Sequence, residues 1–500
     1  MTGPVGRGIL VGPMTIATPI LPGGGDDEGG GLGQVIKLAW PASLTMLNAT
    51  VLKFVDGLMV SHVSPDAMSA QFQAGMWSFV PESFVMGILT VVNTYVAQNF
   101  GRRRLARTAT YAWAGLIIAV AAGALMAPLA VVAPGFFGLL GHGARVAELE
   151  SMYFRYMILT VWMTLSARVL EQFFYGVHRP GVVLAASLAA NGFNVAANYA
   201  LIFGVWGFPM LGLEGAAIGT VAAWALQLGL LVGVFVSRRY DGQFRTRRLR
   251  GLRGRHVADL LRTGLPAGVQ LANDILCWSL FTGVLVGSFF GRAALAATTI
   301  AMRYLGLSFM PTVGIGIAAT AIVGKHIGQG RPDVARRRAH TALGVAMVYM
   351  GLCGLAFWVF RAEMVDVFLQ NVPLGEMTQG QLDAMRGEIM DIGVKILICA
   401  AVFQLLDAVG IVYIGALRGA GDTRWPMVVT MILSWSVVLG VGWSLATWAP
   451  QLGSLGPWIA SSLYVVLLGL FMAGRFERGR WRQIDLLGDR KRRGEADEVR

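Results

Sequence analysis

The sequence is poor in charged residues. Only 14% of its 500 residues are Asp, Glu, Lys or Arg, whereas a soluble domain carries about 25%. Cysteine is also scarce: the three thiols, Cys277, Cys353 and Cys399, all lie within apolar stretches and indicate no disulfide or metal framework. The six histidines are scattered and lack the H-E-x-x-H spacing. These absences argue against a soluble domain, a disulfide-stabilised secreted domain and an integral-membrane enzyme.

Long apolar segments dominate instead. Hydrophobic residues make up 55% of the chain, and the mean hydropathy is +0.61. A helix that crosses a bilayer needs about 20 mostly apolar residues. By that measure the sequence predicts twelve transmembrane helices, and hence an all-α integral membrane protein, with approximate spans at 34–62, 70–98, 106–132, 150–177, 181–205, 212–237, 257–288, 294–327, 338–361, 388–417, 426–447 and 454–474.

Basic residues give the predicted orientation. Twenty Arg and Lys residues lie in or at the edges of the loops that follow even-numbered spans, and four lie in or at the edges of those that follow odd-numbered spans. Because basic loops stay in the cytoplasm, the even loops and both termini are predicted to be cytoplasmic in a plasma (inner) membrane. The net charge of +13 then reflects topology and attraction to lipid headgroups. No nucleic-acid partner is expected.

An internal repeat links the two halves. Pro41 in the first span matches Pro266 in the seventh at an offset of 225, and Asn48 matches Asn273 at the same offset. Both halves hold six spans and start on the same side, so the repeats are parallel about the membrane normal. Transporters built in this way place their sites between or within the halves. Gene duplication without a transport role is the alternative.

The chain therefore divides into five predicted regions. These are a disordered cytoplasmic tail (1–33), an N-terminal six-helix bundle (34–237), a basic cytoplasmic linker (238–256), a C-terminal six-helix bundle (257–474) and a basic cytoplasmic tail (475–500). The N-terminal tail is rich in Gly and Pro and has no convincing cleavage site, which argues against a signal peptide.

Acidic residues inside the predicted spans are the candidate functional groups. Asp56, Asp274 and Asp407 lie within spans one, seven and ten, and Glu82 lies in span two directly after Pro81. A carboxylate in a membrane interior takes up a proton or pairs with a cation to avoid the free-energy cost of desolvation. Such a group can exchange one positive ligand for another. The alternative is a purely structural partner.

Several polar and aromatic residues are candidates for a cation shell or for substrate contact. Asn194 and Asn198 are one turn apart and share a helix face. Interhelical hydrogen bonding is an equally good explanation for such asparagines. Phe403 precedes Asp407 by one turn and offers an aromatic face to a cation, although packing is the commoner use of such a residue. Gln270 belongs to the same group of candidates.

Several segments resemble one known family, the multidrug and toxic-compound extrusion (MATE) transporters, and in particular their NorM-type branch. The resemblance runs from about residue 34 to 475, and its most specific block is the last. The matching segments are Val55–Val60 (VDGLMV), Val96–Gly101 (VAQNFG), Asn194–Gly204 (NVAANYALIFG), Leu265–Gly268 (LPAG), Phe403–Ala408 (FQLLDA) and Gly415–Gly419 (GALRG).

This resemblance implies a V-shaped pair of six-helix bundles that export small cationic, amphipathic compounds in exchange for Na⁺ or H⁺. The coupling carboxylates of the family fall on Asp407, Asp274 and Asp56, with Na⁺ a candidate ligand of Asp407 and Asp274. The resemblance implies no cofactor beyond the coupling ion and no enzymatic activity. The expected partners are the lipid bilayer and the organic substrates, and a monomer is expected.

The sequence also departs from the family pattern. Asp274 stands where the NorM branch usually has Glu, and Glu82 lies outside the usual pattern. Lys53 lies three residues before Asp56 on the same helix face, so an ion pair between them would disable coupling in the first half. We therefore rank Asp407 and Asp274 ahead of Asp56. A flippase for lipid-linked saccharides, from a related superfamily, is the alternative transport function. It would require a cationic central cavity.

Overall fold

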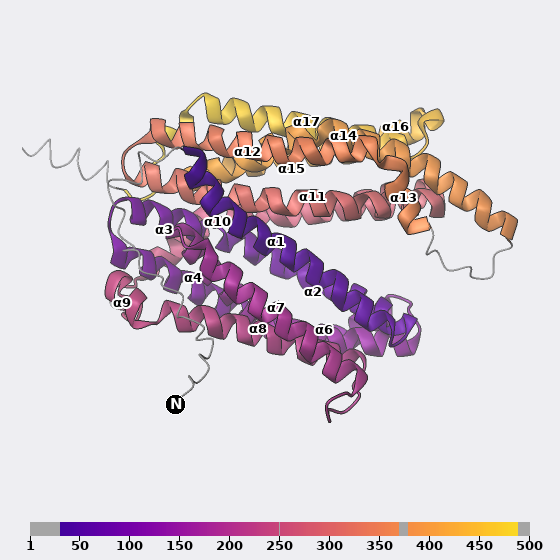
Figure 1. Ribbon diagram of the computed structural model, residues 1–500, viewed down its shortest axis with the longest axis horizontal. Helices are drawn as coiled ribbons and strands as arrows, with labels where there is room; N and C mark the ends of the chain where they lie inside the picture. The colour runs from indigo at the N-terminus through magenta and orange to yellow at the C-terminus, as the bar shows by residue number, and fades with distance from the viewer. Residues whose placement is uncertain (1–30, 250, 370–378, 489–500) are drawn as a thin grey trace, which may run out of the picture.

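The computed structural model describes residues 31–249, 251–369 and 379–488, and every regular element in these ranges is helical. The all-α prediction is therefore confirmed. Most of the predicted N-terminal tail and the end of the predicted C-terminal tail lie outside the described residues. Figure 1 shows two groups of long helices that lie close together at the end where α3 and α10 are labelled and diverge toward the end where α6 and α13 begin.

The first group consists of helices from the first half of the chain. Ser64 caps the N-terminus of the helix that starts at Pro65, because its hydroxyl accepts a hydrogen bond of 3.0 Å from the Ala67 N–H. The helices are α1 (Gly31–Ser61), α2 (Pro65–Leu89), α3 (Val91–Gly101), α4 (Leu105–Met126), α5 (Leu129–Leu139), α6 (Ala144–Gly176), α7 (Pro180–Phe203), α8 (Leu213–Phe235) and the short α9 (Arg238–Phe244).

The second group comes from the rest of the chain and contains two π-helical segments, η1 and η2. Its elements are α10 (Gly254–Leu280), η1 (Phe281–Ser288), α11 (Phe289–Gly328), α12 (Pro332–Val359), α13 (Arg361–Leu369), α14 (Gln379–Ala420), α15 (Arg424–Leu433), η2 (Ser434–Val441), α16 (Gly442–Trp448), the 3₁₀ turn η3 (Pro450–Leu452), α17 (Leu455–Glu477) and the 3₁₀ turn η4 (Arg480–Gln483).

Ten helical stretches in the described residues are long and apolar enough to cross a membrane. One of them, Gly254–Gly328, has 75 residues, or about 110 Å at the helical rise, which far exceeds a hydrocarbon core of about 30 Å. Its backbone leaves the helical region at Gly291 (φ 78°, ψ −165°), so we count two crossings. The 33-residue α6 is not among the ten. With Gly254–Gly328 counted as two crossings and α6 as one more, the number of crossings is the predicted twelve.

The first helix of each half crosses to the other half. Val35 and Leu38 of α1 belong to an apolar cluster with residues of α11, α12 and α14, and Figure 1 shows α1 starting beside α12 and running down to α2. Conversely, Leu260 and Ala267 of α10 lie in the main core of the first half. These exchanges join the two groups at one end. The residue limits of the two bundles stay a prediction.

Two pairs of contacts involve equivalent positions in the two halves. Asn48 donates a hydrogen bond of 3.1 Å to Ser187, and its counterpart Asn273 donates one of 3.0 Å to Ser434. A Cβ added to Gly101 would lie 2.0 Å from the Lys325 carbonyl oxygen, and one added to Gly328 would lie 2.2 Å from the Gln98 carbonyl oxygen. Gly101 and Gly328 are 227 residues apart, and so are their partners Gln98 and Lys325, so each contact is the other with the two halves exchanged. The two halves therefore meet around an approximate two-fold axis.

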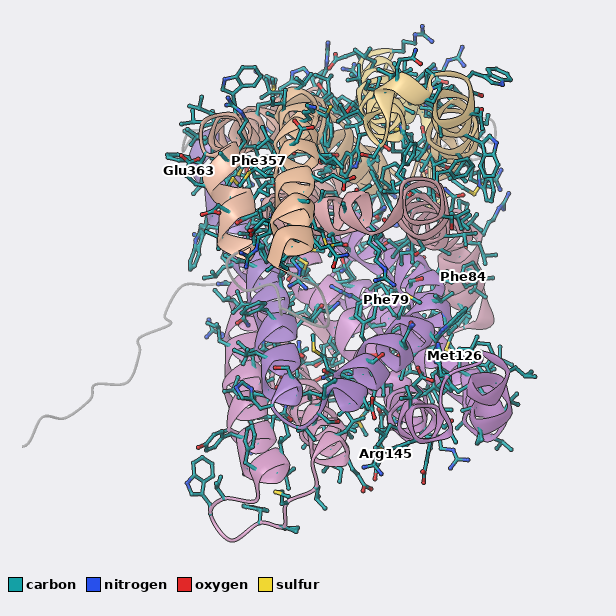
Figure 2. The ribbon with its side chains drawn as sticks, turned by 90° about the vertical axis from the view of Figure 1, so that its right-hand side faces the viewer. Phe79, Phe84, Met126, Arg145, Phe357 and Glu363 are labelled. Carbon is teal, nitrogen blue, oxygen red and sulfur yellow. The ribbon has the colours of Figure 1, made fainter. Side chains whose placement is uncertain are left out.

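We call the end of the molecule that holds this contact the basic end. It carries the arginine-rich α3–α4 turn and α9. Figure 2 views the molecule from the opposite, wide end, where Arg145 of α6 and Glu363 of α13 are labelled in different groups of helices. The divergence toward this end agrees with the V shape that the resemblance implies.

Candidate functional site

In the first half, one carboxylate and two asparagines form a hydrogen-bonded cluster. Asn198 of α7 donates a bond of 2.9 Å to Asp56 of α1 and another of 3.0 Å to the side-chain oxygen of Asn194. The spacing of four residues places both asparagines on one face of α7, as predicted. Both are buried, and Asp56 is half-buried. The structure therefore brings Asp56 of α1 together with the two asparagines of α7.

The same cluster contains an oxygen that has no hydrogen-bond partner among the described residues. This is Asn198 Oδ1, which is buried. Gly219 of α8 faces it so closely that an added Cβ would lie 2.1 Å away. Tyr153 of α6 is also buried and lies near enough for the charge of Asp56 to act on it. Sequence reasoning missed Tyr153, whose only signal is a phenol within a membrane span.

In the second half, three side chains from three helices share one neighbourhood. Tyr464 of α17 is 5% exposed, and the charges of both Asp274 of α10 and Asp407 of α14 act on it. One Asp274 oxygen is buried and has no hydrogen-bond partner in the described part of the chain. Arg418 is the cation that acts on Asp274. Phe403 is buried in the apolar core of the second half, the packing role that its position also allowed.

The amide side chains of α10 near Asp274 form hydrogen bonds with neighbouring helices. Asn273 donates a bond of 3.0 Å to Ser434 and accepts one of 2.8 Å from the indole N–H of Trp435. Gln270 donates a bond of 3.2 Å to the hydroxyl of Thr430. In this conformation Gln270 therefore joins α10 to α15.

The ion pair between Lys53 and Asp56 that the spacing allowed is not formed in the described part of the chain. The Lys53 ammonium instead lies 5.3 Å from the centroid of the Phe79 ring, a favourable cation–π position. Its charge also acts on Glu82, which accepts a hydrogen bond of 2.6 Å from Thr164. Asp56 therefore accepts a hydrogen bond from the Asn198 amide, whereas Lys53 contacts Phe79.

Two further charged residues within the spans pair with each other. Arg168 and Glu171 form the expected salt bridge at 3.0 Å, and Gln227 donates a bond of 2.9 Å to the second oxygen of Glu171. This pair is a structural feature of the first half.

A flippase for lipid-linked saccharides would need its cations gathered in one cavity. Arg303 instead lies 5.8 Å from the Phe368 ring, and Lys395 forms a salt bridge of 2.6 Å with Asp391. Lys53, Arg303 and Lys395 therefore each contact different residues. The structure therefore does not support the cationic cavity on which that alternative depends.

Neither carboxylate cluster resembles a transition-metal site. Among the described residues, no group of three or more His, Cys, Asp or Glu side chains could hold a metal ion. Hard cations such as Na⁺ take oxygen ligands, including amide, hydroxyl and carbonyl oxygens. The two clusters offer carboxylates with amide or phenol oxygens beside them, a donor set suited to a hard cation or a proton.

Two joined groups of membrane helices, each with carboxylates held inside it, define a transporter and not an enzyme. The chain matches the MatE family over residues 41–200 and 273–443. It is 30% identical to the probable multidrug resistance protein NorM of Pseudomonas aeruginosa over 465 residues, which cover 90% of each chain. It is 27% identical to the protein of the same name from Brucella suis, over 89% of this chain and 92% of that one.

The fold agrees with these sequence matches. A solved structure described as the outward-facing conformation of a multidrug resistance MATE family transporter superposes with a TM-score of 0.80. The superposition covers 91% of this chain and 98% of that one, at 18% sequence identity. Since the family match covers more than half of the sequence, the chain belongs to the MatE family. The family resemblance predicted from the sequence motifs is confirmed.

Proposed function

We propose that this transporter is a secondary multidrug antiporter that exports cationic, amphipathic compounds in exchange for Na⁺ or H⁺. The NorM relatives are named as multidrug resistance proteins. The observation that carries the proposal is the neighbourhood of Asp274, Asp407 and Tyr464, with a buried Asp274 oxygen that has no hydrogen-bond partner among the described residues. Such an oxygen is a ready ligand for a cation.

The exchange follows from the electrostatics of a buried carboxylate. An empty, charged carboxylate is costly to carry through the closed conformation, whereas a neutralised one is not. Binding of the coupling ion therefore competes with the positive substrate and permits the return step. The membrane potential contributes about 2.3 kcal/mol per elementary charge per 100 mV, which is enough to drive uphill export.

The arrangement of the chain supports an orientation with the basic end in the cytoplasm. We place both termini on that side of a bacterial plasma membrane and expect a monomer. In the conformation described, the glycine contacts between α3 and α11 hold the basic end together. The wide end then faces outward, toward the side on which substrate would be released.

The test is uptake of an ethidium-like cation into inside-out proteoliposomes under either a pH jump or a Na⁺ jump. We expect D407N and D274N to lower the initial rate at least tenfold, since a hydrogen bond or contact to a charged group contributes about 1.5–3 kcal/mol. The exposed Asp383 supplies a matched control, D383N, which should transport at the rate of the parent. Transport by D407N at the parent's rate would refute the coupling assignment.

A further inference from the structure

A pocket of about 420 Å³ lies at the basic end of the first half, away from both carboxylate clusters. Four arginines line it: Arg103, Arg104, Arg107 and Arg245. Gln243 and the first residues of α4 complete its wall. The positive-inside rule explains why arginines are frequent at this end. It does not explain why four of them, from two segments more than 130 residues apart in the sequence, converge on one concavity.

None of the described residues that line the pocket is acidic. Among the described residues, no carboxylate lies within ion-pair distance of Arg103, Arg107 or Arg245. The nearby Asp241 is engaged, because its Oδ1 accepts a hydrogen bond of 2.9 Å from the Arg247 N–H. The guanidinium groups of Arg103, Arg107 and Arg245, all exposed, therefore have no carboxylate partner in the described part of the chain.

The walls of the pocket are held in place by two aromatic residues. Phe244, at the end of α9, is fully buried, and its ring centroid lies 5.7 Å from that of Phe173. The indole N–H of Trp113 in α4 donates a bond of 2.8 Å to the Thr246 carbonyl oxygen. These contacts tie the α9 segment to α4 and hold Arg245 opposite the arginines of the α3–α4 turn. The pocket is preformed, which lowers the entropic cost of binding a ligand.

Two of the arginines occupy backbone positions where glycine is normally preferred. Arg103 has φ 57° and Arg245 has φ 54°, a left-handed conformation that is uncommon for residues with a Cβ. A residue selected only for the turn would be Gly or Asn. The side chains at these positions therefore supply something beyond the turn itself.

The chemistry of the pocket fits a phosphate group. Arginine guanidinium groups bind phosphate oxygens in pairs of parallel hydrogen bonds. The 22-residue α4 begins at Leu105 in the pocket wall, so the positive end of its helix dipole favours the same anion.

The surface of α4 next to the pocket indicates what kind of phosphate compound would bind there. Ala106 lines the pocket and is exposed, and Ile117 and Val120 are 46% and 51% exposed. At about 100° per residue these three side chains lie on one helix face. Ile117 lies about 16 Å along α4 from Ala106, about the thickness of one hydrocarbon leaflet. We propose that the pocket binds the phosphate of an anionic phospholipid whose acyl chains lie along this face of α4.

The test compares two triple variants that lose the same charge at the same end. R103Q/R107Q/R245Q empties the pocket of three guanidinium groups. R248Q/R337Q/R478Q removes three exposed arginines outside it. Thermal unfolding of the purified full chain in detergent is followed with dihexanoyl-phosphatidylglycerol, dihexanoyl-phosphatidylcholine or inorganic phosphate. We expect phosphatidylglycerol alone to raise the midpoint of the parent and of the control variant.

The pocket variant should need at least about tenfold more phosphatidylglycerol for the same rise, since each basic residue contributes about 1 kcal/mol near an anionic lipid. Equal responses of the two triple variants would overturn the site. Equal protection by inorganic phosphate would overturn the lipid as the ligand. Should R103Q/R107Q/R245Q not fold, R103G/R245G replaces it, because glycine adopts both left-handed conformations freely.

Discussion

Gly219 of α8 lies against the carboxamide of Asn198, and a Cβ at position 219 would come within 2.1 Å of Asn198 Oδ1. Asn198 is in turn the residue that donates to Asp56. Because Gly219 has no side chain, Asn198 can take the position from which it donates a hydrogen bond to Asp56.

The first prediction is that G219A disturbs the Asp56 cluster. The new methyl group must displace the Asn198 carboxamide, and inserting a methyl group into a packed interior costs about 1–3 kcal/mol. We expect a lower thermal midpoint and slower transport of the cationic dye in proteoliposomes. G229A is the matched control, because Gly229 lies on the same helix with no heavy atom within 4 Å of an added Cβ. Equal behaviour of the two variants would show that the Asn198 contact is unimportant.

The sequence predicted the architecture because the relevant signals are local or repeated. Span length, hydropathy and the placement of arginine are read within short windows. The repeat could be recognised because Asn48 and Asn273 each occupy the same place in their half, and the structure gives them equivalent serine partners. The partners themselves, Ser187 and Ser434, are more than 130 residues away in sequence and carry no local signal.

The composition of the sites was only partly predictable for the same reason. The aspartates are conspicuous in apolar spans, but Tyr464 resembles any aromatic residue that packs in a membrane helix. Its position near Asp274 and Asp407 depends on how α17 packs against α14. The π-helical segment that begins at Ser434 was equally invisible, although such segments often occur at functional sites.

The second prediction concerns Tyr464. Y464F keeps the ring and its packing but removes the hydroxyl, on which the charges of Asp274 and Asp407 act. We expect the concentration of coupling ion that gives half-maximal transport to rise about three- to tenfold, the effect of losing a hydrogen bond of about 0.5–1.5 kcal/mol. The thermal midpoint should change little. Y199F, at a phenol that is 45% exposed, is the control, and a shift of the same size in both variants would argue against a role for Tyr464.

The third prediction concerns Lys53. Because its ammonium contacts Phe79 and no ion pair joins it to Asp56 in the described residues, removing its charge should leave first-half coupling unchanged. We expect K53Q to transport the dye within about twofold of the parent, as for an exposed charge of small net effect. K37Q, on the same helix, controls for the loss of a basic residue. A large gain in coupled transport for K53Q alone would show that Lys53 pairs with Asp56 during the cycle.

The fourth prediction concerns the glycine contacts that hold the basic end together. A Cβ on Gly101 would lie 2.0 Å from the Lys325 carbonyl oxygen, and one on Gly328 would lie 2.2 Å from that of Gln98. Both contacts are with backbone, which has little freedom to move aside. G101A and G328A should therefore disfavour the conformation described here. Hydrogen exchange of the amides in α3 should become faster in both variants as the basic end separates.

The control for this pair is G344A in α12, where an added Cβ meets no heavy atom within 4 Å. Replacing glycine by alanine within a helix is otherwise stabilising by about 1 kcal/mol, so G344A should be as stable as the parent or more stable. The equivalence of the two contacts adds a stricter requirement. Because G101A and G328A alter the same contact on opposite sides of the two-fold axis, they should accelerate exchange to a similar degree. Faster exchange in only one of the two variants would mean that the two glycine contacts do not contribute equally to holding the basic end together.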